Sequence, residues 1–226
     1  MKIFIDTASV DEITRYANLG FIDGVTTNPA LMATEQRSAI DVISEIVEIV
    51  DGPISVEVVS KDATRMVAEA RHLASLHENI VVKLPAIPAG FEALNVVAGL
   101  GIKVNFTMIY TANQALLAAK LGATYVSPFV GRLDVTSTGG PELISEIITI
   151  YENYDFETQV LAASMRNSLY VKYAALAGAH AATIPPSVLK EMLESEMTQL
   201  ALDGFLAQWE TLPAESKASL FDGVEG

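Results

Sequence analysis

The chain has 226 residues, half of them hydrophobic, and its 14 basic and 28 acidic residues give a formal charge of -14 at pH 7. Nucleic acids and anionic membranes are bound mainly through clustered lysine and arginine, so we expect neither as a partner. Because the chain contains no cysteine, disulfides, cysteine catalysis and thiolate metal sites are excluded.

Targeting and membrane signals are absent from the sequence. No run reaches the 18 apolar residues of a membrane span, and the start MKIFIDTAS does not have the form of a signal peptide. The three histidines, His72, His77 and His180, form no ligand cluster. We therefore expect a soluble, cytoplasmic protein without a metal site.

Eight β-rich runs alternate along the chain with segments of helical periodicity. The runs are residues 3–7, 24–28, 54–59, 80–85, 103–108, 125–130, 159–164 and 179–185. Helical spacing is clear over residues 40–50, 63–76, 112–121 and 141–151. Strands that alternate with helices predict parallel pairing, and eight such units fit a (β/α)₈ TIM barrel. A doubly wound open sheet is the alternative; it is less favoured because no glycine-rich nucleotide loop follows the first run.

No linker or repeat divides the chain, so we expect one barrel domain over residues 1–226. Residues 191–209 have the pattern of an extra helix beyond the eighth unit. The C-terminal helix and tail would begin at about residue 191, and the acidic end of the tail could be loose or could dock on a neighbour.

Polar residues in the predicted strands share one parity. Strand side chains alternate between faces, and a barrel strand covered by helices is normally apolar on both. A polar set near the carboxyl ends therefore indicates a site, because that end carries the chemistry in barrel enzymes. Asn28 alone has a simpler interpretation, since it precedes Pro29 and could serve a turn. The matched positions are Thr26 with Asn28, Ser55 with Glu57, Asn105 with Thr107, Ser127 with Phe129, and Val81 with Lys83 and Pro85.

Three charged residues, Asp6, Glu57 and Lys83, fall on three different predicted strands. Lys83 lies near the end of the apolar run NIVVKLP, and Glu57 lies among valines, where an unpaired carboxylate would be costly. Asp6 and Thr7 could instead cap the first helix. Together, an inward-facing lysine and two acids predict a catalytic site.

This residue set suits Schiff-base chemistry. A lysine that loses its proton in an apolar site becomes a nucleophile whose natural target is a carbonyl. The resulting Schiff base stabilises an adjacent carbanion, so a carbon–carbon bond can break or form while Asp6 and Glu57 move protons. Hydroxyl and amide side chains would hold a polyhydroxylated substrate, and loops after late strands frequently bind phosphate. The binding candidates are Thr26, Asn28, Asn105, Thr107 and Ser127, with Arg132, Ser164 and Arg166 for phosphate.

Seven segments resemble the small transaldolase family, which includes the fructose-6-phosphate aldolases. They are FIDTAS, GVTTNP, VEVVS, IVVKLP, NFTMIY, VSPFVGRLD and LAASMR, in that order over about residues 1–210. The resemblance implies a cofactor-independent barrel enzyme whose fourth strand carries the Schiff-base lysine, at Lys83. It also implies that Asp6 handles protons and that Glu57 acts through a water placed with the help of Thr107.

The same resemblance assigns the remaining residues. It implies that Asn28 and Asn105 bind the hydroxyls of a dihydroxyacetone unit and that Ser127 lines the same pocket. The phosphate would be bound by Arg132, Ser164 and Arg166.

Two positions favour the transaldolase branch over the aldolase branch. The aldolase branch typically has glutamine in place of Glu57 and tyrosine in place of Phe129, which we assign to the substrate pocket. A phenylalanine cannot place a water or a proton as a tyrosine hydroxyl could, so we expect transfer rather than release of free dihydroxyacetone. The chain departs from the family at Pro85-Ala86-Ile87-Pro88, which lacks the threonine usual soon after Lys-x-Pro. This loop borders the site, so the departure bears on rate and substrate preference.

The sequence therefore predicts a transaldolase of the pentose phosphate pathway that acts on sugar phosphates. The alternatives are a fructose-6-phosphate aldolase, which would release free dihydroxyacetone, and a non-catalytic barrel that binds sugar phosphates without needing Lys83. The resemblance also implies a homo-oligomer, a pentamer or decamer, with the C-terminal helix packed on a neighbour.

Overall fold

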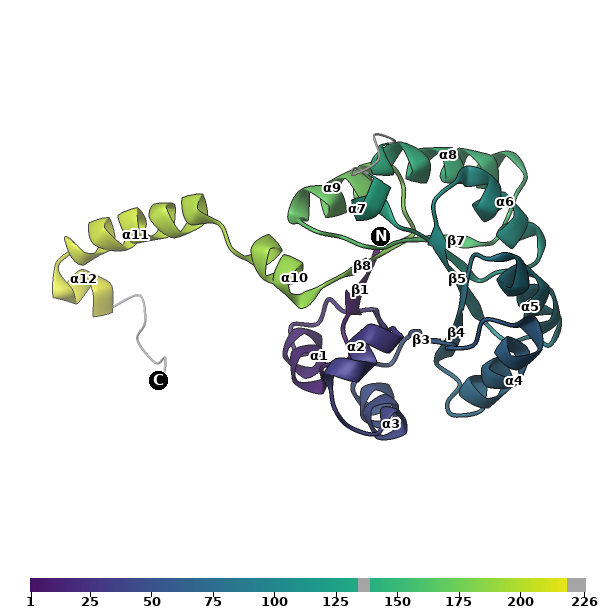
Figure 1. Ribbon diagram of the computed structural model, residues 1–226. Coiled ribbons are helices and arrows are strands. Elements are labelled where there is room, and N and C mark those ends of the chain that lie inside the picture. Colours follow the sequence, from purple (N-terminus) through teal and green to yellow (C-terminus); the bar gives the residue numbers. More distant parts are fainter. Residues whose placement is uncertain (134–138, 219–226) are drawn as a thin grey trace. The chain divides into compact units, whose positions relative to one another are not determined.

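The computed structural model describes residues 1–133 and 139–218, without the side chains of residues 132, 133 and 218. Eight parallel strands close into a barrel in chain order, and Figure 1 shows helices surrounding the strands. The strand β1 pairs with both β2 and β8, so the predicted barrel is confirmed and the open sheet is wrong. The strands are β1 (Lys2–Asp6), β2 (Gly24–Thr26), β3 (Ile54–Glu57), β4 (Ile80–Pro85), β5 (Val104–Ile109), β6 (Tyr125–Pro128), β7 (Gln159–Ala162) and β8 (Ala181–Ile184).

Several helices begin at a residue whose side chain caps the helix, among them α1, α3 and α4. Ser9 accepts a hydrogen bond from the Glu12 amide and caps the first helix, so the alternative cap at Asp6 and Thr7 is wrong and Asp6 stays in β1. The helices over this part of the chain are α1 (Val10–Ala17), α2 (Pro29–Thr34), α3 (Ala39–Ile49), α4 (Ala63–Ala74), α5 (Pro88–Gly99), α6 (Ala112–Lys120), α7 (Val130–Leu133), α8 (Gly140–Asn153), α9 (Ser168–Leu176) and α10 (Pro186–Leu193).

An apolar cluster inside the barrel indicates which positions of the strands face the lumen. It contains Phe4, Val81, Tyr125, Leu161 and Ala181, all buried, with the rings of Phe4 and Tyr125 in edge contact at 6.0 Å. Side chains two positions further along a strand face the same way. Polar residues therefore follow this cluster towards the carboxyl ends of β1, β4, β6 and β8: Asp6, Lys83, Ser127 and Thr183.

Four strands end two residues earlier than the sequence predicts. The runs concerned are 24–28, 54–59, 125–130 and 159–164. Local hydrogen bonds and backbone geometry compete with the strand ladder at three of these ends. Asn28 caps α2, the amides of Val59 and Ser60 donate to Glu69, and Ser164 has a left-handed φ of 62°. The residues beyond the strands thus form the loops that border the site.

The chain divides into two compact units, Met1–Leu189 and Lys190–Gly226. Within the second unit, the predicted helix over 191–209 is interrupted, because Ser195 accepts a hydrogen bond from the Thr198 amide and begins α11 (Glu196–Glu210). The short α12 (Ala214–Ala218) follows, and Lys217 contacts the Glu210 carboxylate at 2.7 Å. In the described ranges, no helix is long and apolar enough to cross a membrane.

Candidate active site

A polar cavity of about 160 Å³ lies at the carboxyl ends of the barrel strands. Most of the predicted site residues meet in it, although they come from strands far apart in the sequence. Its lining consists of Asp6, Thr26, Asn28, Lys83, Asn105, Ser127, Phe129, Ala163, Ser164 and Thr183.

Lys83 is held inside the barrel by Thr27, just after β2, and by Glu57 on β3. Its residue is 6% exposed, and its Nζ donates to the Thr27 carbonyl at 3.0 Å and lies 3.3 Å from Glu57 Oε2. Glu57 and Lys83 are directly paired in the register of β3 and β4, which fixes this contact. The lysine in the apolar run NIVVKLP therefore points into the cavity rather than into solvent.

Two partly buried carboxyls, Asp6 and Glu57, interact electrostatically with this amine. Burial raises the pKa of Asp6 above its usual value, although the charge of Lys83 and a hydrogen bond from Thr26 act in the opposite direction. Burial likewise raises the pKa of Glu57, against the charge and hydrogen bond of Lys83, and the nearby Asp6 adds to the rise. Carboxyls with raised pKa values exchange protons closer to neutral pH, as acid–base catalysis needs.

Hydrogen bonds fix the amide and hydroxyl groups across the cavity floor. Ser127 Oγ donates to Asn105 Oδ1 at 2.8 Å, and Asn105 Nδ2 donates to Ser55 Oγ at 3.1 Å. Asn28 Oδ1 accepts the Leu31 amide at 3.0 Å, so this residue caps α2 and also lines the cavity. The local interpretation of Asn28 is therefore compatible with its place in the cavity, and its substrate-binding role stays a prediction, for which its amide nitrogen can donate to a ligand.

Thr107 lies on β5 beside this row and is fully buried. Its hydroxyl has no hydrogen-bond partner among the described residues. Buried hydroxyls are normally paired, so this one suits the predicted role of placing a water molecule.

The predicted phosphate residues gather at the ends of β6 and β7. Ser164 lines the cavity in a left-handed conformation that non-glycine residues rarely adopt. A Cβ at Gly131 would lie 2.2 Å from the Ser164 carbonyl oxygen and 2.9 Å from Arg166 Cγ, so only glycine lets α7 approach this closely. The Arg166 side chain is exposed at this edge. The side chain of Arg132, next to Gly131, lies outside the described residues.

Phe129 closes the cavity between β5 and β7. Its backbone bridges Ala163, and its ring meets the ring of Tyr110 edge-on at 5.8 Å. The wall at this point is therefore aromatic carbon.

Thr183 is a lining residue that the sequence analysis missed. Its Oγ1 lies 2.6 Å from Thr26 Oγ1, which in turn donates to Asp6 Oδ1 at 2.7 Å. The parity rule contained the signal, because Thr183 lies two residues after the buried Ala181. The run AATI around it contains no charged residue, so parity is the signal in this run that indicates a site residue.

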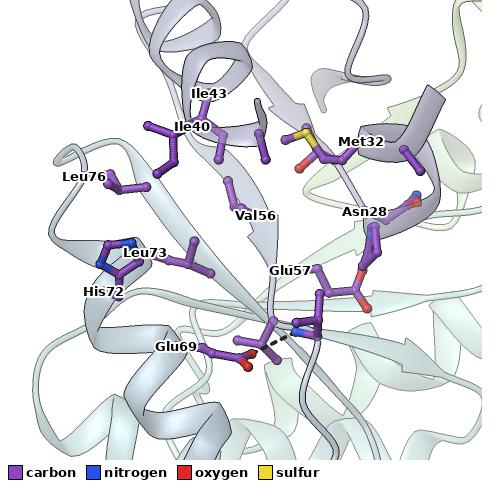
Figure 2. Close-up of a pocket in the computed structure, with 16 residues that line it drawn as sticks. Asn28, Met32, Ile40, Ile43, Val56, Glu57, Glu69, His72, Leu73 and Leu76 are labelled. Atoms are coloured by element: carbon purple, nitrogen blue, oxygen red, sulfur yellow. Dashed lines mark hydrogen bonds between the residues drawn. The ribbon is translucent and has the colours of Figure 1, made fainter. Parts of the chain in front are cut away.

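A larger pocket of about 480 Å³ lies on the outer side of β3, between α2, α3 and α4. Figure 2 shows carbon side chains around it, among them Ile40, Ile43 and Leu73, with Asn28 and Glu57 at one edge. This lining does not match a polyhydroxylated substrate, so the smaller polar cavity is the candidate active site. No group of three histidine, aspartate or glutamate side chains in the described residues could hold a metal ion.

Comparisons with known proteins agree with this geometry. The family model described as transaldolase/fructose-6-phosphate aldolase matches residues 3–222. A probable transaldolase of Thermoanaerobacter sp. (strain X514) is 53% identical over 92% of this chain and 97% of its own length. One from Geobacter sulfurreducens is 53% identical over 94% of this chain and all of its own.

Solved structures of lower identity share the fold alone. The N-acetylmannosamine-6-phosphate 2-epimerase of Clostridium perfringens has a TM-score of 0.59 at 17% identity, over 83% of this chain and 87% of that one. A mandelate oxidase mutant has a TM-score of 0.59 at 15% identity, over 82% and 65%. The match along nearly the whole chain is decisive: the protein belongs to the transaldolase/fructose-6-phosphate aldolase family.

Proposed function

We propose that the protein is a transaldolase that moves a dihydroxyacetone unit between sugar phosphates through a Schiff base on Lys83. The observation that carries the proposal is the buried Lys83 amine, 3.3 Å from Glu57 in a cavity that Asp6 also lines. The donors would be sedoheptulose 7-phosphate or fructose 6-phosphate. The acceptors would be glyceraldehyde 3-phosphate or erythrose 4-phosphate, as in the pentose phosphate pathway of the cytoplasm.

The first half-reaction forms the Schiff base. The free amine of Lys83 attacks the C2 carbonyl of the ketose, and the carbinolamine hydroxyl leaves as water after it gains a proton. Glu57 lies next to Lys83 Nζ and is suited to supply that proton through a water placed by Thr107. The resulting iminium withdraws electrons from C3.

The second step breaks the carbon–carbon bond. Asp6 accepts the proton of the C4 hydroxyl, the C3–C4 bond breaks, and its electron pair passes to C3 and the iminium as an enamine. The aldose phosphate leaves, and an acceptor aldehyde is attacked by the enamine carbon while Asp6 returns the proton. Water then hydrolyses the new iminium and releases the product and the Lys83 amine.

The remaining lining residues suit the two ends of the substrate. Asn28, Asn105 and Ser127 offer fixed amide and hydroxyl groups to the dihydroxyacetone unit. Ser164 and the exposed Arg166 offer a hydroxyl and a guanidinium to the phosphate.

Reductive trapping tests the Schiff base. Borohydride is added with fructose 6-phosphate, and intact mass is measured for the wild type, Lys83→Met and the control Lys103→Met, which changes a lysine whose amine contacts the Glu78 carbonyl. We expect a dihydroxyacetone-sized adduct on Lys83 in the wild type and the control, and none in Lys83→Met. Sugar-phosphate binding without an adduct in any protein would instead favour a non-catalytic barrel.

Transfer and release are separated by a coupled assay without acceptor aldehyde. Because Phe129 presents ring carbon to the cavity, we expect little free dihydroxyacetone from the wild type and more from Phe129→Tyr. Release by the wild type at the rate of transfer would identify a fructose-6-phosphate aldolase.

We also propose that the protein is a homo-oligomer, a pentamer or decamer. The helix α11 supports this, because large apolar side chains on it are exposed, including Met197 at 73% and Phe205 at 69%. Light scattering after size exclusion should give a mass several times 24.2 kDa. A monomer mass at micromolar concentration would contradict the proposal.

A further inference from the structure

Three side-chain oxygens form a continuous row beside the cavity. Asp6 Oδ1 on β1 lies 2.7 Å from Thr26 Oγ1 on β2, which lies 2.6 Å from Thr183 Oγ1 on β8. Thr26 and Thr183 are buried, at 1% and 3% exposure. The row crosses the barrel strands on both sides of β1, because β1 pairs with β2 and with β8.

Counting protons fixes the direction of these bonds. Each threonine hydroxyl donates one proton, and an ionised carboxylate only accepts. When Asp6 is ionised, Thr26 must donate to it, so the contact between the hydroxyls requires Thr183 to donate to Thr26. When Asp6 carries a proton on Oδ1, Asp6 can donate to Thr26 and Thr26 to Thr183. The switch requires only rotation of two hydroxyl groups.

We propose that Thr183 is a positioning residue for proton transfer by Asp6. When Asp6 is ionised, Thr183 donates a hydrogen bond to Thr26 and so orients the Thr26 hydroxyl towards the carboxylate. When Asp6 is protonated, Thr183 accepts the reversed hydrogen bond from Thr26. The inference rests on the proposed transaldolase function and adds to it a residue on β8, across the barrel from Lys83.

The charged neighbours of Asp6 do not replace this row. Lys83 on β4 and Glu57 on β3 interact electrostatically with Asp6. The strands that flank β1, by contrast, contribute GVT and AATI, which contain no titratable side chain. On these strands, the hydroxyls of Thr26 and Thr183 are therefore the groups that can reverse their hydrogen bonds when Asp6 gains or loses a proton.

Removal of the Thr183 hydroxyl should weaken proton transfer more than substrate binding. In Thr183→Val, Thr26 loses its donor, and hydrogen bonds in a chain strengthen one another. We expect kcat for transfer to fall about tenfold, a part of the 100-fold or more typical of acid–base catalysis, with KM changed less than about twofold. The acid limb of the pH–rate profile should move to higher pH, because the carboxylate is less stabilised.

The experiment measures kcat, KM and the pH–rate profile for the wild type, Thr183→Val, Thr183→Ser and Thr158→Val. Thr183→Ser keeps the hydroxyl and should restore both kcat and the profile. Thr158→Val removes another buried hydroxyl, one bonded to the Ala123 carbonyl outside the site, and should leave the profile unchanged. If Thr183→Val does not fold, Thr183→Ala replaces it.

Borohydride trapping in the same proteins separates the two proposals. Adduct on Lys83 with an unshifted profile in Thr183→Val, or a shift that Thr183→Ser does not restore, would overturn the role of Thr183 alone. No adduct in the wild type would overturn the proposed function and this inference with it.

Discussion

Glu57 and Glu69 line the same apolar pocket, yet their environments act on them in opposite directions (Figure 2). Burial beside one lysine raises the pKa of Glu57. Burial also acts on Glu69, but bonds from the Ser60 hydroxyl and the amides of Val59 and Ser60 outweigh it and lower its pKa. Residue type alone therefore does not predict the direction in which the pKa of a glutamate shifts in this barrel.

The two tasks follow from the partners of each group. Glu69 on α4 accepts three hydrogen bonds from the loop that follows β3, so its charge is committed to holding that loop. Glu57, the last residue of β3, lies 3.3 Å from the amine of Lys83, which the proposed function makes the nucleophile. One carboxylate holds the backbone of a loop, and the other contacts the lysine of the candidate site.

The largest expected effect is on activity, at Glu57. Glu57→Gln removes the acid but keeps the shape, so transfer should slow by about 100-fold to 10,000-fold, the usual contribution of a general acid–base group. The measurement is kcat in a coupled transfer assay. Glu69→Gln should retain activity within about tenfold, and an equal loss in both variants would break the distinction between them.

The next effect is on stability, at Glu69. Hydrogen bonds to charged groups contribute about 1.5–3 kcal/mol each, less where exposed, so Glu69→Ala should cost about 2 kcal/mol. In a chain of this size that lowers Tm by roughly 4–8 °C, whereas the exposed Glu92→Ala should change it little.

The pH dependence of that loss gives a further check. A lowered pKa contributes stability above the unfolded value of about 4.3 and loses it as pH falls through the folded pKa. The difference between wild type and Glu69→Ala should therefore shrink in acid. A difference that grows in acid would contradict the role of the charge.

Asp6 should show the opposite pH dependence. Its pKa is raised by burial, so its contribution is fully present below the unfolded value of about 3.9 and is lost as pH rises through the folded pKa. Asp6→Asn should thus be more stable than the wild type at about pH 8.5, with a smaller gain at about pH 5.5. Thermal unfolding at both pH values checks this. If Asp6→Asn gained more stability at the lower pH than at the higher pH, ionisation of Asp6 would not destabilise the folded protein, which would contradict the raised pKa.

Much of this arrangement was predictable because strand parity and helix periodicity are local signals. The eight strands, the closed barrel and the inward parity of Lys83 and Asn105 follow from them. Seven family segments then indicated the site residues, whose catalytic roles stay predictions. The role of Glu69 was not predictable, since its hydrogen bonds join residues nine and ten positions apart across a loop.

Other features escaped prediction for different physical reasons. Ser164 has a left-handed backbone that no sequence rule assigns to serine. Thr183 has the correct parity, but its hydroxyl contacts Thr26, which is 157 residues away along the chain, and strand parity does not predict such a contact. The break before Ser195 depends on a cap inside a pattern that otherwise reads as one helix.

The loop after β4 provides the smallest expected effect and contrasts with the loop that Glu69 holds. The helix α5 begins at Pro88, and its N-cap residue Ile87 makes no side-chain capping hydrogen bond. Ile87 lies in the segment where the family usually has a threonine. Ile87→Thr would supply a hydroxyl for an α5 amide and lose little burial, because Ile87 is 38% exposed. We expect a gain of about 1 kcal/mol, or roughly 2–4 °C in Tm.

The matched control is Asp62→Ala, which removes the cap of α4 at the Arg65 amide and should cost a similar amount. The backbone tie from the Ala86 amide to the Thr107 carbonyl holds the same loop against β5 in either variant. Because that tie persists, kcat should stay within about twofold in Ile87→Thr, far below the effect of a lost acid–base group. A higher Tm with unchanged kcat and KM would mean that the departure at Ile87 affects helix capping rather than chemistry. A shift in KM between ketose phosphates would instead make this loop part of substrate selection, as the position of β4 beside the cavity allows.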